Sequence, residues 1–471
     1  MIRGMGIVAG MLSLALAGRA DAAEKPAPGP TYHKDVEPLL QKHCQDCHRP
    51  GQVAPFALLE YEQARKRATD LAQTTGEKKM PPWPASTTYG GPFHDARVLT
   101  DAEIDTLKRW AEAGAPEGSK ADAPPPREFA GDWPLGPPDL VLTMPEPYNL
   151  DAAGDDDFRV FVLKTNLPAD RAIRAVDFKP GNRRVVHHVI AAVDTSGRGR
   201  ALDAADPKPG YHAIGGFGPG VPLRAFLPIW TPGSKPRFAP EGAGYTLPKG
   251  ADILIQMHYH KSGKPELDAT AIGLYLTDKP VEKRLGTGFV FPTVGPLQQL
   301  GLAAKAKAAR DAGKRVDLTD MMRDILVIPP GKADYTVKGS SKAMGRPFQR
   351  DILITAVMPH MHWLGKEFTF WAVLPDEKQT RVPLIKIDHW NFNWQGTYAF
   401  EKPVRLPQGA WLEMEAHFDN SADNPNNPSK PPKLVRWGDQ TNDEMCIGIF
   451  EFMAAEGDLP APGANRAGRG Q

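Results

Sequence analysis

The spacing of hydrophobic positions changes at about residue 139. Before it, apolar residues recur at helical intervals: Ile104, Leu107 and Ala111 share one face, directly after the capping box Thr100-Asp101-Ala102-Glu103. After it come short β-rich runs separated by Gly, Pro, Asp and Asn, which is typical of antiparallel sandwiches. These runs are LVLTM, FRVFVL, VVHHVIAAV, ILIQMHYH, AIGLYLT, DILITAVMPHMH, EFTFWAVL and WLEMEAHF. We predict a multidomain chain, with a small all-α domain followed by two all-β antiparallel sandwich lobes of jelly-roll type.

The domain boundaries are predicted from changes in the hydrophobic pattern and the local composition. A proline-rich linker, 120–138, follows the all-α domain, because APPPREFAGDWPLGPP fills most of it. The predicted units are a signal peptide at 1–22, the all-α domain at 31–119, the first lobe at 139–284 and the second lobe at 285–456. An Ala- and Lys-rich helical insertion is expected at 297–322 of the second lobe, and a disordered tail at 457–471.

The composition and the N-terminal residues indicate where the protein is located. The 471 residues are 41% hydrophobic and 24% charged with a net charge of +1, which describes a soluble protein and gives no reason to expect nucleic-acid binding. Arg3, the apolar run Met5–Ala17 and the small-x-small site Ala20-Asp21-Ala22 predict an export signal. A membrane anchor is the alternative, but the run is short for a bilayer. We expect cleavage, a periplasmic or secreted protein and no remaining membrane span.

The string CQDCH supplies two thiols one helical turn apart and an adjacent imidazole. Cys44 and Cys47 can add to haem vinyl groups, and His48 can then bind the iron. A bare CxxC is also used for redox or zinc chemistry, but the trailing histidine favours haem. Met80, in a proline-rich loop, is the expected sixth iron ligand, with His94 as the alternative. The stretch 31–119 resembles a class I cytochrome c domain, which implies electron transfer.

The third cysteine, Cys446, lies in the apolar run MCIGIF and is interpreted as a small buried hydrophobe. With haem on the other two cysteines, the mature chain has no disulfide.

Histidines form three clusters on predicted strands, at His187-His188, His258-Tyr259-His260 and His360-Met361-His362. Residues i and i+2 share a strand face, so a His-x-His pair can chelate one metal. Adjacent histidines face opposite ways, so His187 and His188 converge only through a bulge or local twist. Imidazole with a thioether favours copper, and Met445 in NDEMC is the candidate thioether.

These motifs resemble those of the copper type II ascorbate-dependent monooxygenases, the family of peptidylglycine α-hydroxylating monooxygenase and dopamine β-monooxygenase. VVHHVIAAV, IQMHYH, MPHMHWLGK and TNDEMC occur in family order over roughly 139–456. The resemblance implies two sandwich lobes with one copper each. It places an electron-transfer copper on His187, His188 and His258, with His260 as a possible replacement for His258. It places the catalytic, oxygen-activating copper on His360, His362 and Met445. His212 and His417 have no matching role and are interpreted as structural.

Two departures from the family bear on the substrate. The peptide-amidating members have an Arg that grips the substrate carboxylate two residues before the His-x-His pair, where this chain has Met358. They have Asn and Tyr where this chain has Ile447 and Ile449. The resemblance therefore implies a small apolar organic substrate. The disulfides of the family are also missing, so the lobes depend on packing.

The sequence thus predicts an exported copper-dependent monooxygenase that hydroxylates a C–H bond with O2. Its cofactors are two copper ions and one covalently bound haem c, and electrons are delivered through the haem from an ascorbate-like reductant or a redox protein. The alternative is a non-enzymatic copper-binding, electron-transfer or sensor protein. A haem peroxidase needs an open iron site, which Met80 argues against. The substrate, the electron donor and the oligomeric state stay open.

Overall fold

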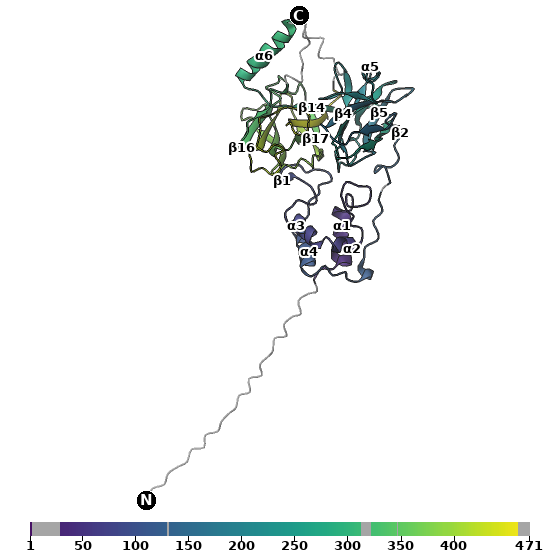
Figure 1. Ribbon diagram of the computed structural model, residues 1–471, viewed down its shortest axis with the longest axis vertical. Coiled ribbons are helices and arrows are strands. Elements are labelled where there is room, and N and C mark those ends of the chain that lie inside the picture. The colour runs from purple at the N-terminus through teal and green to yellow at the C-terminus, as the bar shows by residue number, and fades with distance from the viewer. Residues whose placement is uncertain (2–28, 130, 312–321, 346, 460–471) are drawn as a thin grey trace.

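The computed structural model describes residues 29–129, 131–311, 322–345 and 347–459, together with Met1. The predicted signal peptide at 1–22, apart from Met1, and all of the predicted tail beyond 459 lie outside the described residues. The chain is mostly β, with several antiparallel sheets and a small helical N-terminal region, as predicted. Figure 1 shows this helical region below two groups of strands that lie side by side. Among the described helices, none is long and apolar enough to cross a membrane.

The helical region is packed around the predicted amphipathic helix α4. Its elements are η1 (Tyr32–Val36), α1 (Glu37–His43), α2 (Tyr61–Arg65), α3 (Ala68–Gly76), α4 (Asp101–Glu112) and η2 (Lys120–Asp122). The capping box is present at the start of α4: the Thr100 hydroxyl accepts from the Glu103 N–H at 3.2 Å, and the Glu103 carboxylate accepts from the Thr100 N–H at 2.8 Å. Leu107 and Trp110 of α4 are buried in one cluster with Leu40 of α1.

The first lobe consists of two five-stranded sheets. One has the strand order β7-β4-β10-β6-β8 and the other β13-β9-β5-β12-β2, with β3 and β11 as a short separate pair. The bounds are β2 (Leu140–Thr143), β3 (Tyr148–Leu150), β4 (Asp157–Lys164), β5 (Arg171–Lys179), β6 (Val186–Asp194), α5 (Arg198–Asp203), β7 (Tyr211–His212), β8 (Leu223–Phe226), β9 (Ala243–Leu247), β10 (Asp252–Tyr259), β11 (Glu266–Asp268), β12 (Ala271–Thr277) and β13 (Lys283–Arg284). Leu163 and Ile255 of the first sheet share a buried cluster with Ile173 and Leu274 of the second, so the two sheets pack face to face.

The second lobe also has two sheets. One has the strand order β19-β18-β21-β16, with β1 (Ala85–Gly90) added beside β19, and the other has the order β14-β23-β17-β20, while β15 pairs with β22. The bounds are β14 (Gly286–Val290), β15 (Val327–Ile328), β16 (Lys332–Ser340), β17 (Ile352–Met361), β18 (Gly365–Val373), β19 (Arg381–Ile387), β20 (Tyr398–Leu406), β21 (Trp411–Asn420), β22 (Val435–Arg436) and β23 (Cys446–Ala454). Ile354, Phe370, Met414 and Phe450 meet in its core. Helix α6 (Pro296–Asp311) begins one residue before the predicted insertion and covers its first half, and residues 312–321 of that insertion fall outside the described residues.

A segment of the N-terminal region is built into the second lobe. Strand β1 (Ala85–Gly90) pairs antiparallel with β19, and Phe93 forms a bridge with Phe400 of β20. Gly90 has a φ of +75°, and a Cβ there would lie 1.9 Å from the Leu384 carbonyl oxygen, so only glycine fits this close approach. Ala85 and Phe93 are buried in the core of the second lobe. The helical region is therefore attached to this lobe through a shared sheet as well as through the linker to the first lobe.

Candidate metal centres

Three histidines of the first lobe converge on one point. His188 on β6 pairs with His258 on β10, but the next pair joins Val186 to Tyr259, so His187 is an extra, bulged residue. The predicted bulge is therefore present, and it turns His187 toward its neighbour. The Nδ1 atom of His188 lies 3.3 Å from Nδ1 of His187 and 3.3 Å from Nδ1 of His258. Ligand atoms of the three residues all lie within 4.8 Å of one another, so one ion can contact all three imidazoles.

Burial keeps these imidazoles neutral. Burial, followed by the neighbouring charge of His258, lowers the pKa of His187 to about 3. Burial also lowers the pKa of His188 and of His258 below the usual histidine value. A metal needs the lone pair of a neutral imidazole, and these side chains hold no proton that would have to be displaced.

Asp156, just before β4, orients His258. Its Oδ2 accepts from Nε2 of His258 at 3.1 Å, which leaves the Nδ1 lone pair of His258 for a metal. Its Oδ1 accepts from Nδ1 of His260 at 3.0 Å. The structure therefore brings His258 into the cluster and leaves His260 outside it, with an exposed side chain. Asp156 also accepts from the N–H of Thr441 in the second lobe at 3.0 Å, and from its hydroxyl. Burial opposes ionisation, but the hydrogen bonds from His258 and His260 keep the pKa of Asp156 below its usual range.

His360 and His362 flank Met361 at the end of β17, and Met445 directly precedes β23. Strand β17 pairs with β23 so that Met361 lies opposite Cys446, and continuing this register by one residue places Met445 opposite His362. Directly opposed residues share a sheet face, as do residues two apart on a strand. Met361 and Cys446 point the other way and are buried in the core. The ring centroids of His360 and His362 are 5.2 Å apart.

Hydrogen bonds fix the tautomer of both histidines. Nδ1 of His362 lies 3.1 Å from the Asp443 carbonyl oxygen, which can only accept. Nδ1 of His360 lies 2.5 Å from Oε1 of Gln395, whose amide nitrogen donates to the Phe392 carbonyl at 2.9 Å. Both Nδ1 atoms therefore carry the hydrogen, and both Nε2 atoms keep a lone pair. Burial lowers the pKa of His360 to about 4 and that of His362 well below its usual value.

The carboxylate of Glu444 holds the backbone of this second set. Glu444 is fully buried, and it accepts from the N–H of Met445 and the N–H of Leu364, each at 2.9 Å, and from the N–H of His362. Burial raises the pKa of Glu444 to about 8. The residue therefore links the two chain segments that carry His362 and Met445.

Cys44, Cys47 and His48 form one turn after α1. The N–H groups of Cys47 and His48 donate to the Cys44 carbonyl at 3.1 and 3.0 Å. Both thiols are free and half-buried. Nδ1 of His48 lies 3.2 Å from the Phe56 carbonyl oxygen, so it carries the hydrogen and Nε2 keeps its lone pair. Free paired thiols and an oriented imidazole are the donor set that a covalent haem requires.

The two candidates for the opposite iron ligand lie in different surroundings. Met80 is 42% exposed, and its N–H donates to the carbonyl of Thr74 in the last turn of α3 at 3.1 Å. The N–H of His94 donates to Ala399 of the second lobe at 2.8 Å. Met80 therefore stays a prediction. Cys446 is a fully buried free thiol, as predicted.

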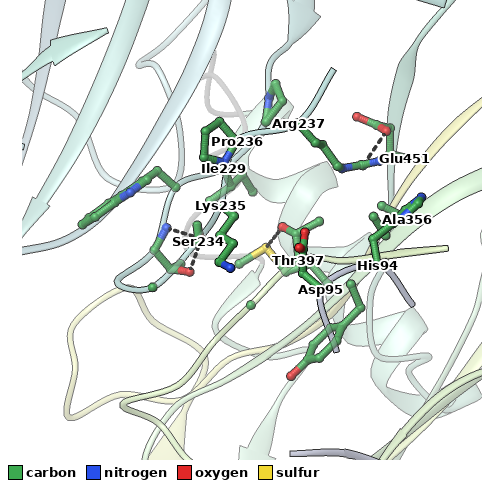
Figure 2. Close-up of a pocket in the computed structure, with 18 of the residues that line it drawn as sticks. His94, Asp95, Ile229, Ser234, Lys235, Pro236, Arg237, Ala356, Thr397 and Glu451 are labelled. Atoms are coloured by element: carbon green, nitrogen blue, oxygen red, sulfur yellow. Dashed lines mark hydrogen bonds and ion pairs between the residues drawn. The ribbon is translucent and has the colours of Figure 1, made fainter. Parts of the chain in front are cut away.

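A pocket opens where the 83–97 segment, the first lobe and the second lobe meet. Its empty volume, mouth included, is about 1240 Å³. Figure 2 shows side chains from all three parts around it, among them His94, Lys235 and Thr397. Its wall contains Met358 and Ile449, two of the three residues whose apolar character the sequence linked to the substrate. Met358 lies two residues before His360 on the same face of β17, so the strand that lines the pocket also carries His360.

A comparison with known protein families finds a match in the second lobe. Residues 314–455 match the family described as copper type II ascorbate-dependent monooxygenase, C-terminal domain. This range contains His360, His362 and Met445, whereas the first three histidines and CQDCH lie outside it. No curated protein sequence matches the chain.

Among solved structures, the major capsid protein P2 of bacteriophage PM2 is similar at 10% identity and a TM-score of 0.25, over 67% of this chain and 97% of the other. The glycosylasparaginase PNGase F of Flavobacterium meningosepticum is similar at 11% identity and a TM-score of 0.23, over 67% and 98%. At these TM-scores the likeness supports no conclusion about function.

The sequence analysis did not identify several residues that surround the ligands. Asp156 stands in the acidic run GDDDF, and Gln395 and Phe392 stand in a loop between β19 and β20 with no motif. Glu444 directly precedes Met445 in NDEMC, and an acid beside a candidate ligand was a usable signal. His417 pairs with Asp334 at 2.8 Å, and neither it nor the exposed His212 belongs to either ligand set.

Proposed function

We propose that the chain is an exported copper-dependent monooxygenase, periplasmic or secreted, that hydroxylates a C–H bond of a small apolar substrate with O2. The observation that carries the proposal is the pair of ligand sets. Three neutral histidines converge in the first lobe. In the second lobe His360 and His362 lie at the end of β17, and extending its pairing with β23 would place Met445 opposite His362. The second set falls within the stretch that matches the copper monooxygenase domain.

Bound copper supplies the electron transfer and the oxygen chemistry, and the protein supplies ligand geometry and substrate position. His187, His188 and His258 would hold the electron-transfer copper through Nδ1. His360 and His362 would hold the catalytic copper through Nε2. The thioether of Met445 favours Cu(I), the form that reacts with oxygen.

The protein around these ligands has two further tasks. Asp156 and Gln395 keep His258 and His360 in the tautomers that leave a lone pair toward the metal. Met358 and Ile449 give the pocket an apolar stretch of wall beside Lys235, Arg237 and Glu451, and a small apolar substrate would bind against that stretch.

The N-terminal region is proposed to carry one haem c on Cys44 and Cys47, with His48 and Met80 as iron ligands. Bound haem supplies one-electron transfer. Its site adjoins the first lobe, because Asp46 of CQDCH pairs with Lys235 at 2.9 Å. An ascorbate-like reductant or a redox protein would deliver electrons through it to the copper sites.

The proposal predicts two coppers and one iron per chain. At saturating copper, His187→Ala should lose one copper and keep the other, because the six ligands divide into two separate sets. Metal content is measured by mass spectrometry after removal of loosely bound ions. Zinc in both sets under copper-replete conditions, with no redox activity, would contradict the scheme.

The reaction is tested with an untargeted mixture of small apolar compounds, ascorbate and ¹⁸O2. We expect a product that gains one ¹⁸O atom, and its loss in the His360→Ala variant. A protein that binds two coppers but forms no labelled product from any compound would favour the non-enzymatic alternative, a copper-binding electron-transfer or sensor protein.

A further inference from the structure

One loop of the second lobe contacts both ligand sets. The ring of Phe392, between β19 and β20, stacks on His187 with centroids 5.0 Å apart and an angle of 19°. The same ring meets His362 edge to face at 5.8 Å. Three residues later, Gln395 accepts from Nδ1 of His360 and donates to the Phe392 carbonyl. Phe392 and Gln395 are each only 6% exposed, so these contacts are packed and dry.

The same loop is fixed to the first lobe. The Thr231 hydroxyl donates to the Gln395 carbonyl. Gly233 packs so closely on Trp394 that a Cβ at this position would lie 2.2 Å from the indole ring. A second connection runs through Asp156, which accepts from His258 on one side and from Thr441 on the other. Phe392 therefore contacts both ligand sets, and Asp156 links the first set to the loop that leads to Glu444.

We propose that the two sets bind copper cooperatively, with Phe392 as the residue that couples them. The inference rests on the proposed function, since it requires both sets to bind copper. Metal at the first set fixes the His187 ring, and the fixed ring orders the face of Phe392. An ordered Phe392 holds Gln395, which holds His360 with its Nε2 lone pair free. The second metal then binds to a site that is already ordered, so its binding loses less conformational entropy.

The coupling must be reciprocal, because thermodynamic linkage requires each copper to change the affinity for the other by the same factor. Coupling between two binding sites commonly changes affinity by about 5–150-fold, and the contact through a single ring favours the lower part of this range. Cooperativity of this kind lowers the share of half-loaded protein, so the second copper binds more readily than the first.

The experiment compares copper affinities in chelator competition under anaerobic, reducing conditions with the full-length protein. His360→Ala isolates the first set, and His187→Ala isolates the second. In the wild-type protein we expect the overall binding constant to exceed the product of the two isolated constants by about fivefold or more. His187→Gln and His362→Ala repeat the measurement if either alanine variant does not fold, as judged by circular dichroism.

The copper-binding constants of the Phe392→Leu variant test whether this ring couples the two sets. We expect it to bind both coppers but without the excess, while Phe392→Tyr, which keeps the ring, retains it. Phe400→Leu is the matched control, because Phe400 is equally buried in the same lobe but packs on Phe93 away from both sets. A wild-type constant equal to the product of the isolated constants, or an excess that survives Phe392→Leu, overturns the inference and leaves the proposed function standing. Absence of copper at either set in the wild-type protein overturns the proposed function itself.

Discussion

A Met445→Ile protein is expected to fold and to lose substrate oxidation. Isoleucine preserves apolar bulk but removes the sulfur that stabilises Cu(I) at the second set. Met445 directly precedes β23, and its backbone N–H donates to the buried Glu444 side chain, so the swap leaves the frame of the site in place. Activity, copper content and thermal unfolding are measured together.

The opposite interpretation is that Met445 only packs against the core, which its side chain also touches. A near-isosteric swap then costs less than about 1.5 kcal/mol of stability and retains activity. Met361→Ile is the matched control, because Met361 is fully buried on the core face between the two histidines. We expect Met361→Ile to keep its activity. Full turnover by Met445→Ile would remove Met445 from the ligand set.

The second large effect concerns haem. Wild-type protein should show a low-spin c-type spectrum, and its haem should survive denaturation because two thioether bonds hold it. Replacing both Cys44 and Cys47 by alanine should abolish covalent haem completely. Cys446→Ala should not, because that thiol is buried in the core of the second lobe. Haem that remains attached after denaturation in the double variant would refute the assignment.

The sixth ligand is tested on the same protein. Met80→Ala should open the iron site to added ligands and lower the reduction potential, because a thioether stabilises ferrous iron. An unchanged spectrum would direct the test to His94, whose backbone is bound to the second lobe.

The parts of this structure that follow from local spacing were predictable. The capping box at Thr100 fixed the start of α4, and two adjacent histidines on a strand required the bulge at His187. The convergence of His187, His188 and His258 depends on how β6 and β10 pair, and the resemblance to a known family supplied that grouping. The roles of Asp156, Phe392 and Gln395 depend on how two lobes meet, and no local pattern encodes that distance.

The insertion of β1 into the second lobe was also beyond the sequence pattern. ASTTYG has no alternation of apolar and polar residues that would indicate a strand, and its partner β19 lies almost 300 residues further along the chain. Only the fold brings the two together.

The strand β1 also limits how the chain can be divided. In the intact protein it covers one side of β19, which is otherwise the last strand of its sheet. A shortened protein that begins at residue 139 would expose that row of backbone N–H and C=O groups together with the core surface under Ala85 and Phe93. Bare sheet edges of this kind recruit strands from other molecules. The N-terminal region would then also keep the protein soluble, and the two lobes expressed without it would self-associate.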